Sequence, residues 1–181
     1  GENMRVLVER KMVRASAGGT GFAKTGGNYA RSLKTAMRAK QMGLNQTLWL
    51  DSDRHRYIEE LSGMNVFVVI KGELHTPPVG DTILHGITRD SIVKLARSQG
   101  LKVHEQPLDV DEVLRQLRSG ECTEAFACGT AAIITPISLF AEEDGTSVAP
   151  REANAPLGMR LRKSLLDLQE GRSADAFGWR Q

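Results

Sequence analysis

Apolar and polar residues follow two different periods along this chain, and one of them predicts strands. Residues 5–13 alternate loosely and are rich in valine, which is typical of a strand. Residues 64–70 form a continuous apolar run that indicates a buried strand, followed by a predicted hairpin turn at 71–73. Shorter strands are expected at 47–50, 74–76, 103–108, 124–127 and 133–137.

The other period is helical. Residues 28–42 place Leu33 and Met37 one turn apart, and Gly43 follows as a stop. Three further helices are expected after residues 81–91, after the N-cap candidate Asp109, and over residues 156–170. Because strands interleave with a few helices and short hairpins, the pattern favours an α+β fold with a mixed sheet over a doubly wound parallel sheet.

Composition limits the class of protein. The 181 residues suffice for one sizeable domain, and the net charge of +2 without a dense Lys/Arg block does not favour a nucleic-acid partner. Cys122 and Cys128 suit neither a disulfide framework nor a zinc site, so we predict a reducing, cytoplasmic location. The four histidines show no metal-ligand spacing, which disfavours a metal enzyme. We also expect no signal peptide and no membrane-spanning segment.

The stretch from residue 22 to residue 30 combines groups that suit covalent chemistry. It holds Lys24, two consecutive glycines and then Tyr29. Adjacent glycines let the backbone approach a ligand closely, and a desolvated lysine forms Schiff bases with carbonyl compounds. A phenol can hydrogen-bond an oxygen of the bound molecule. Taken alone, the stretch favours the simpler interpretation, a surface lysine that precedes a glycine helix start.

Two further segments are candidates for binding an anion. Residues 86–88 lie where the second helix is predicted to begin, and a helix N-terminus offers free N–H groups and partial positive charge. Residues 129–131 form a tight turn between two predicted strands, with one hydroxyl and clustered N–H groups. In isolation, the first segment also fits a plain Thr88 cap and the second a plain hairpin.

One acidic residue completes the set. Glu60 precedes the buried strand predicted at 64–70, and a carboxylate there needs a cationic or protonated partner. A pyridinium N–H would serve and would keep that ring an electron sink. The alternative is a solvated turn glutamate. An imine-forming lysine, a ring-nitrogen acid and two phosphate-binding turns together are the parts that pyridoxal phosphate requires.

Four motifs carry a resemblance to a known family: residues 24–29, 60–67, 84–90 and 129–132. In their order and spacing the chain resembles the fold-type IV pyridoxal-phosphate enzymes, most closely the branched-chain amino acid aminotransferases. The resemblance implies a mixed sheet, or pseudo-barrel, flanked by helices. It assigns residues 5–181 to the large C-terminal, cofactor-binding domain, without the small N-terminal domain that covers the other side of the site.

The resemblance also implies roles for the residues around the cofactor ring. Lys24 would be the Schiff-base lysine and the proton carrier. Tyr29 would hydrogen-bond the phenolic oxygen, Glu60 would pair with the pyridine nitrogen, and Leu84 would pack on the ring.

Four residues would hold the anionic groups. Ile87, Thr88 and Thr130 would bind the phosphate, the first through its backbone N–H. The N–H groups of Thr130 and Ala131 would also face the substrate carboxylate. The family's fold type implies a homodimer, with small amino acids and 2-oxo acids as substrates.

The expected activity is transamination of leucine, isoleucine or valine with 2-oxoglutarate. Two alternatives stay open. One is another activity of the same fold, a D-amino acid aminotransferase or an aminodeoxychorismate lyase. The other is a fragment that binds the cofactor without turnover, because most of the side-chain pocket would belong to the small domain.

Overall fold

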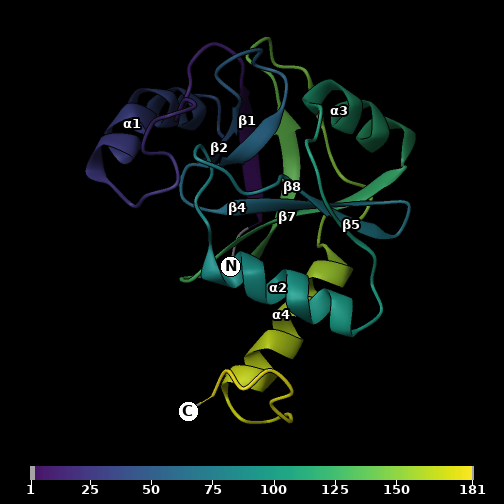
Figure 1. The fold of residues 1–181 in the computed structure, drawn as a ribbon. Coiled ribbons are helices and arrows are strands. Elements are labelled where there is room, and N and C mark those ends of the chain that lie inside the picture. Colours follow the sequence, from purple (N-terminus) through teal and green to yellow (C-terminus); the bar gives the residue numbers. More distant parts are fainter. Residues whose placement is uncertain (1–2, 181) are drawn as a thin grey trace.

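The computed structural model describes residues 3–180, which form one sheet and four helices (Figure 1). The strands run in the order β3-β2-β1-β8-β7-β4-β5-β6, and β9 pairs with β8. The strands are β1 Met4–Glu9, β2 Gln46–Leu50, β3 Ile58–Leu61, β4 Asn65–Ile70, β5 Glu73–Thr76, β6 Val103–Glu105, β7 Cys122–Gly129, β8 Ile133–Ala141 and β9 Ser147–Val148. The helices are α1 Gly26–Gln41, α2 Ile87–Ser98, α3 Val110–Ser119 and α4 Pro156–Gln169.

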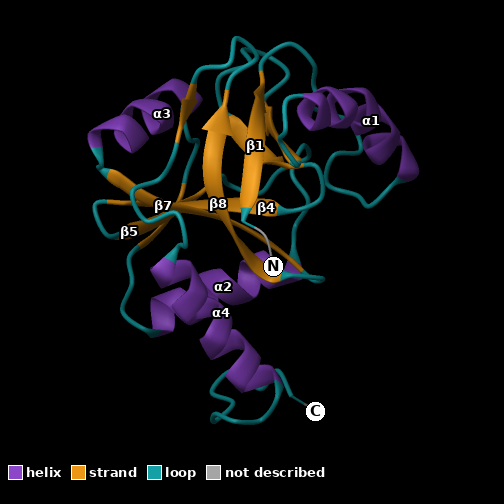
Figure 2. Ribbon diagram, turned by 180° about the vertical axis from the view of Figure 1, so that it is seen from behind, coloured by secondary structure: helices purple, strands orange, loops and turns teal. Residues whose placement is uncertain are grey.

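The sheet is mixed and bends at β8. The first half of β8 pairs antiparallel with β7, and its second half pairs parallel with β1. The long strand therefore belongs to two differently oriented parts of the sheet. Figure 2 shows β1 and β8 upright while β4 and β7 lie across them. This half-barrel confirms the predicted α+β class with a mixed sheet.

Strand β4 lies between two hydrophobic cores, which explains why its sequence is a continuous apolar run. Val66 and Val68 belong to the core beneath α3. Phe67 and Val69 belong to the core shared with α2 and α4, where Phe67 stacks on Phe126 with ring centroids 5.3 Å apart. Burying both faces of β4 fixes the ends of the strands that surround the candidate site.

Helix α1 forms where it was predicted, but its apolar residues face outward. Leu33 is 64% exposed and Met37 is 67% exposed, whereas Ser32, Thr35 and Ala39 are buried. Small side chains on the inner face allow the helix to lie close to the sheet, and Ala39 packs with Leu7 of β1. The apolar periodicity therefore predicted the helix correctly, but none of the described residues covers the apolar stripe that it forms.

Other predicted elements are confirmed with altered ends. Strand β1 stops at Glu9, because the Glu9 carboxylate accepts the N–H groups of Lys11 and Met12 and turns the chain. Strand β6 ends at Glu105, shortly before Pro107, which has no N–H to donate. Strand β3 was not predicted as a strand and pairs antiparallel with β2.

The hairpin of β4 and β5, the N-cap of α3 at Asp109 and helices α2 and α4 match the prediction. Within residues 3–180, every helix is too short or too polar to cross a membrane.

Candidate active site

Four segments that are distant in the sequence line one pocket between the loop before α1, strand β3, the start of α2 and the turn between β7 and β8. Six of the predicted site residues line it: Lys24, Glu60, Leu84, Ile87, Thr88 and Thr130. The enclosed part is small, about 40 Å³. A ligand the size of a pyridine ring would therefore sit at the mouth of the pocket, with Glu60 behind it.

The loop that carries Lys24 is held by a buried side chain of α1. The Asn28 amide nitrogen donates to the carbonyl oxygens of Thr20, at 2.7 Å, and Ala23, at 2.9 Å. The Thr20 hydroxyl in turn donates to the Asn28 amide oxygen at 3.1 Å. Lys24 itself is exposed. The backbone on which Lys24 stands is thus fixed, while its amine is free to reach a ligand.

Glu60 lies at the back of the pocket and is 3% exposed. One of its carboxylate oxygens accepts the backbone N–H of Leu84 at 3.0 Å, and the Asn65 amide lies 3.4 Å from the same oxygen. The other oxygen is 3.2 Å from the guanidinium of Arg14. Burial raises the pKa of Glu60 to about 7, and Arg14 and the Leu84 N–H oppose this rise. An added cationic N–H in front of Glu60 would favour its ionised form.

Arg14 was not singled out by sequence analysis, yet it connects three parts of the site. It is 4% exposed, contacts Glu60, and donates to the carbonyl oxygens of Gly21 and Thr82. Gly21 belongs to the loop of Lys24 and Thr82 to the loop that leads to α2. A Cβ at position 21 would lie 2.6 Å from Thr82 backbone atoms, so only glycine fits this contact. The sequence offered one sign of this role for Arg14, namely an arginine in a loop of small residues.

The first turn of α2 faces the pocket with its N–H groups. Its N-cap is Gly86, and no side chain among the described residues caps this end. The N–H groups of a first helical turn have no partner within the helix, so they suit an anion. A Cβ on Gly86 would lie 2.2 Å from the Asn65 amide oxygen, so glycine is required by close packing at this position. Asn65 also donates to the Leu84 carbonyl at 2.9 Å and so fixes the approach to the helix.

The second anion-binding candidate is the turn that joins β7 to β8. Gly129 pairs with Ile133, and Thr130 stands exposed on the turn between them. Ile133 has φ +60°, which is unusual for a β-branched residue. Such strain persists where the surrounding structure fixes the backbone, here at the rim of the pocket.

Two predicted site residues do not line the pocket. The Tyr29 side chain is on the exposed face of α1, at the rim, where its ring lies 4.0 Å from a Cβ built on Gly63. Ala131 is exposed on the β7–β8 turn, one residue beyond Thr130. The structure therefore places both next to the pocket, and their predicted roles toward a ligand stay predictions.

A second buried acid lies beside Glu60. Glu59 is 6% exposed, and one of its carboxylate oxygens has no hydrogen-bond partner among the described residues. Burial raises the pKa of Glu59 to about 7, as it does for Glu60. Between pH 4.5 and 7 the folded chain therefore holds protons that the unfolded chain has released, so its stability falls as the pH rises through this window.

We expect Glu59→Gln to remove part of this pH dependence. The wild-type chain should lose roughly 1–3 kcal/mol more unfolding free energy than the variant between pH 5 and pH 7. Urea unfolding of both proteins at the two pH values measures the difference. The comparison cancels the opposite contribution of His75, whose pKa burial lowers. Glu170→Gln, at an exposed position, is the control, and equal slopes for Glu59→Gln and wild type would contradict the assignment.

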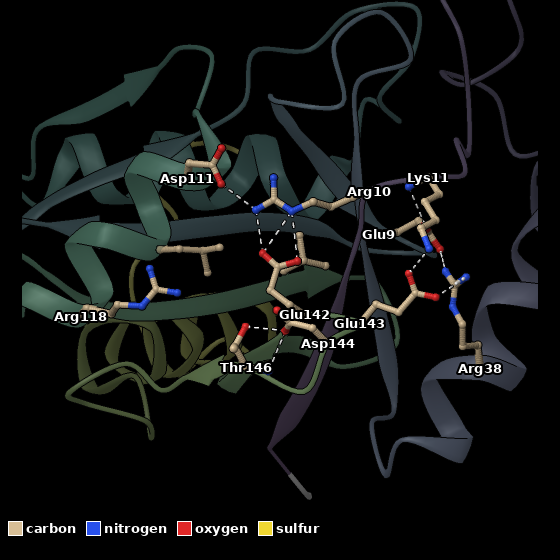
Figure 3. A pocket seen from close by; sticks show the side chains of 12 residues that line it. Glu9, Arg10, Lys11, Arg38, Asp111, Arg118, Glu142, Glu143, Asp144 and Thr146 are labelled. Carbon is tan, nitrogen blue, oxygen red and sulfur yellow. Dashed lines mark hydrogen bonds and ion pairs between the residues drawn. The ribbon is translucent and has the colours of Figure 1, made fainter.

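A larger pocket, of about 660 Å³, lies elsewhere and contains none of the predicted site residues (Figure 3). Most of its charged side chains already pair with one another, and Arg118 stands apart from these pairs. Arg10 donates to Glu142 and Asp111, Lys11 pairs with Glu143, and Arg38 contacts Glu9 and Glu143. This pocket is an ion-pair network that connects β1, α1, α3 and the β8–β9 turn.

Comparison with known proteins was made against families, curated sequences and solved structures. Residues 4–140 match the amino-transferase class IV family. The chain is 45% identical over 178 residues to the branched-chain-amino-acid aminotransferase of Mycolicibacterium smegmatis, covering 96% of this chain and 48% of that protein. It is 42% identical over 176 residues to branched-chain-amino-acid aminotransferase 2 of Bacillus subtilis, covering 97% of this chain and 48% of that protein.

Solved structures agree with the sequence matches. The branched-chain amino acid aminotransferase of Escherichia coli superposes with a TM-score of 0.81 at 33% identity, over 98% of this chain and 55% of that chain. The enzyme of Thermobaculum terrenum, solved in its PLP form, gives a TM-score of 0.79 at 28% identity, over 95% of this chain and 52% of that chain. The chain spans about half the length of the curated relatives. The resemblance inferred from the four sequence motifs is confirmed, and the chain belongs to the class IV aminotransferases.

Proposed function

We propose that residues 5–181 form the cofactor-binding half of a branched-chain amino acid aminotransferase. The observation that carries the proposal is the pocket in which Lys24, Glu60 and two anion-binding turns meet. Relatives with this name are 41–45% identical over nearly the whole chain. Because the chain spans about half of them, we propose that a second, smaller domain completes the site.

The residues of the pocket fit pyridoxal 5′-phosphate, the cofactor with which the Thermobaculum terrenum relative was solved; a second relative was solved with pyridoxamine 5′-phosphate. This cofactor supplies an aldehyde that condenses with amines and a pyridinium ring that withdraws electrons from the substrate Cα. Glu60 is a buried carboxylate in need of a cationic N–H, and it lies behind the open mouth of the pocket. The first turn of α2 and the turn at Thr130 supply donors suited to a phosphate. The donor set thus matches the three polar ends of the cofactor.

Each residue then has a task of its own. Lys24 would be the residue that holds the cofactor, and its amine would move the proton at the substrate Cα. Glu60, held by Arg14 and the Leu84 N–H, would hold the proton on the ring nitrogen. Leu84 would pack on the ring, and Tyr29 would hydrogen-bond the phenolic oxygen. Ile87, Thr88 and Thr130 would bind the phosphate, and the N–H groups of Thr130 and Ala131 would face the substrate carboxylate.

The proposed reaction exchanges an amino group between leucine, isoleucine or valine and 2-oxoglutarate. The complete protein is proposed to be a cytoplasmic homodimer. The outward apolar stripe of α1, with Leu33 and Met37, offers a surface on which the missing domain or the partner subunit would pack. A substrate panel on the complete protein separates this activity from those of other class IV enzymes.

The assignment of Lys24 is tested by covalent trapping. Pyridoxal phosphate and then borohydride are added to the chain, which should attach the pyridoxyl group irreversibly to Lys24, because its amine is exposed at the pocket. Peptide mapping by mass spectrometry locates the label. Lys24→Arg keeps the charge and should lose the label, while Lys34 and Lys40 of α1 are internal controls in the same digest. A label spread evenly over these lysines would contradict the proposal.

A further inference from the structure

A second group of ligand-forming side chains lies on the edge of the sheet, away from the pocket of Lys24. His75 on β5 and His104 on β6 are register partners of two parallel strands, and their rings stack with centroids 4.5 Å apart. Glu73 lies two residues before His75, on the same face, and its carboxylate is 2.7 Å from His104 Nε2. One donor atom from each of the three residues lies within 4.8 Å of the other two.

The histidine spacing did not indicate this group, because the two histidines are 29 positions apart and meet only through strand pairing. Glu105, between His104 and Gln106, points to the opposite face, where it pairs with Arg89 and Arg97 of α2. The three donors therefore share the face that carries the core beneath α3, in which Val68 is the strand partner of His75.

The described surroundings of His75 offer its ring little hydrogen bonding. It is 9% exposed, and its Nδ1 has one side-chain neighbour within hydrogen-bond distance, the Gln106 amide at 3.4 Å. Lys102 lies 3.0 Å from the Glu73 carboxylate. Two imidazoles and a carboxylate form a donor set that prefers zinc and its neighbours in the periodic table.

We propose that Glu73, His75 and His104 bind one divalent transition-metal ion of the Zn²⁺ type. Ligand atoms of a tetrahedral zinc ion are about 3.4 Å apart, given zinc–ligand bonds of about 2.1 Å. The two rings are stacked at an interplanar angle of 19°, and imidazole lone pairs lie in the ring planes, so the partly exposed His104 ring must turn out of the stack before both rings can bind one ion. The fourth position faces solvent and takes water. Binding displaces the Lys102 ammonium from Glu73, so Lys102 competes with the ion.

The ion would fasten the edge strand β6 to β5. Strand β6 is three residues long and is the last strand of the sheet, with its outer edge unpaired among the described residues. A ligand that binds the folded state alone stabilises it by mass action, so the site strengthens this edge when metal is present. Cys122 and Cys128 are buried and do not compete for the ion.

The test is calorimetric titration of ZnCl₂ into the tag-free 181-residue chain at about pH 7.5, above the usual histidine pKa. We expect one Zn²⁺ per chain and a higher melting temperature with Zn²⁺ than with Mg²⁺. Glu73→Gln and His104→Gln should each weaken binding by at least roughly tenfold, since even residues outside the ligand set have effects of that size. Both positions are partly exposed, so these variants should fold.

Two further variants separate a metal site from a structural pair of stacked rings. Lys102→Ala should tighten Zn²⁺ binding severalfold, because it removes the competing ammonium. His85→Gln, which alters an exposed histidine outside the cluster, should leave Zn²⁺ affinity unchanged. Absence of stoichiometric binding by the wild-type chain would overturn the proposal, and so would equal affinity in wild type and His104→Gln.

Discussion

Replacing Glu60 with glutamine in the complete aminotransferase should lower kcat roughly 100-fold or more, while affinity for the cofactor falls much less. Glutamine keeps a carbonyl oxygen that can accept the Leu84 N–H at the position where Glu60 now accepts it at 3.0 Å. It loses the negative charge that, in the proposed role of Glu60, would keep a proton on the ring nitrogen. The loss therefore falls on stabilisation of negative charge at Cα, which exists only in the transition state. A single polar group of this kind contributes factors of about 10²–10⁴.

The measurement compares kcat for leucine with the cofactor dissociation constant. The matched control is Glu59→Gln, which neutralises the adjacent buried carboxylate outside the pocket lining. It should change stability, as argued above, and leave kcat within a few-fold of wild type. Wild-type turnover in Glu60→Gln would show that Glu60 is a structural acid that anchors Arg14 and the Leu84 loop.

Thr88→Val and Thr130→Val should give the reverse result. Valine matches the shape of threonine and removes one hydroxyl from each anion-binding turn. Each change should weaken cofactor retention before it lowers kcat measured at saturating cofactor. Glu60→Gln should mainly lower kcat, whereas the two threonine variants should mainly weaken cofactor binding. This difference would show that Glu60 acts on the ring nitrogen and that the two threonines act on the phosphate.

Local sequence patterns were sufficient to predict much of this fold, because the signals are local in physical origin. The valine-rich run of β1 and the apolar run of β4 both correspond to strands that are buried on two faces, and Asp109 caps α3 through its own carboxylate. Gly86, before α2, marks a position where the backbone approaches another group, whereas a Cβ built on Gly26 or Gly27 at the start of α1 would meet no atom within 4 Å. The resemblance then assigned roles that no local pattern contains.

Contacts between distant segments could not be predicted in this way. Arg14 touches Glu60 and the loops at Gly21 and Thr82, and nothing in the residues around it specifies these partners. His75 and His104 meet only because β5 and β6 run parallel in a particular register. A sequence shows which residues can bind or ionise, whereas tertiary pairing decides which of them meet.

In helix α1 the apolar periodicity predicts the helix correctly, but it does not predict which face of the helix packs on the sheet. Apolar spacing usually marks the face of a helix that packs on the core. Here the inner face is small and polar, with Ser32 and Thr35 buried, and Leu33 and Met37 point away from the described residues. Phe22 and Tyr29, both partly exposed, lie near the N-terminal end of this helix. An exposed apolar stripe of this kind is typical of a surface that packs against another body, in line with the proposed second domain or partner subunit.

The 181-residue chain alone should therefore bind pyridoxal phosphate weakly, self-associate, and show little or no transamination of leucine. The pocket of Lys24 is open on one side, and water there weakens the charge interactions on which catalysis depends. A leucine side chain without an apolar pocket forgoes roughly 3 kcal/mol, at about 0.8 kcal/mol per CH₂ group, which is more than a 100-fold loss in kcat/KM. Sedimentation velocity measures the association, and a coupled assay with leucine and 2-oxoglutarate measures the activity.

The double variant Leu33→Glu, Met37→Glu tests the cause of the association. Both residues are on the exposed face of α1, so the variant should fold and yet remain monomeric at concentrations where the wild-type chain associates. Lys34→Glu and Lys40→Glu, at polar exposed positions of the same helix, introduce the same two carboxylates with an even larger change of net charge, and they should not prevent association. Supplying the missing half of the protein, fused or in trans, should restore leucine turnover to the wild-type chain and not to Lys24→Ala. Turnover by the 181-residue chain at the rate of an intact aminotransferase would show instead that the pocket described here is complete, because one side of the site would then suffice for the chemistry and for leucine selection.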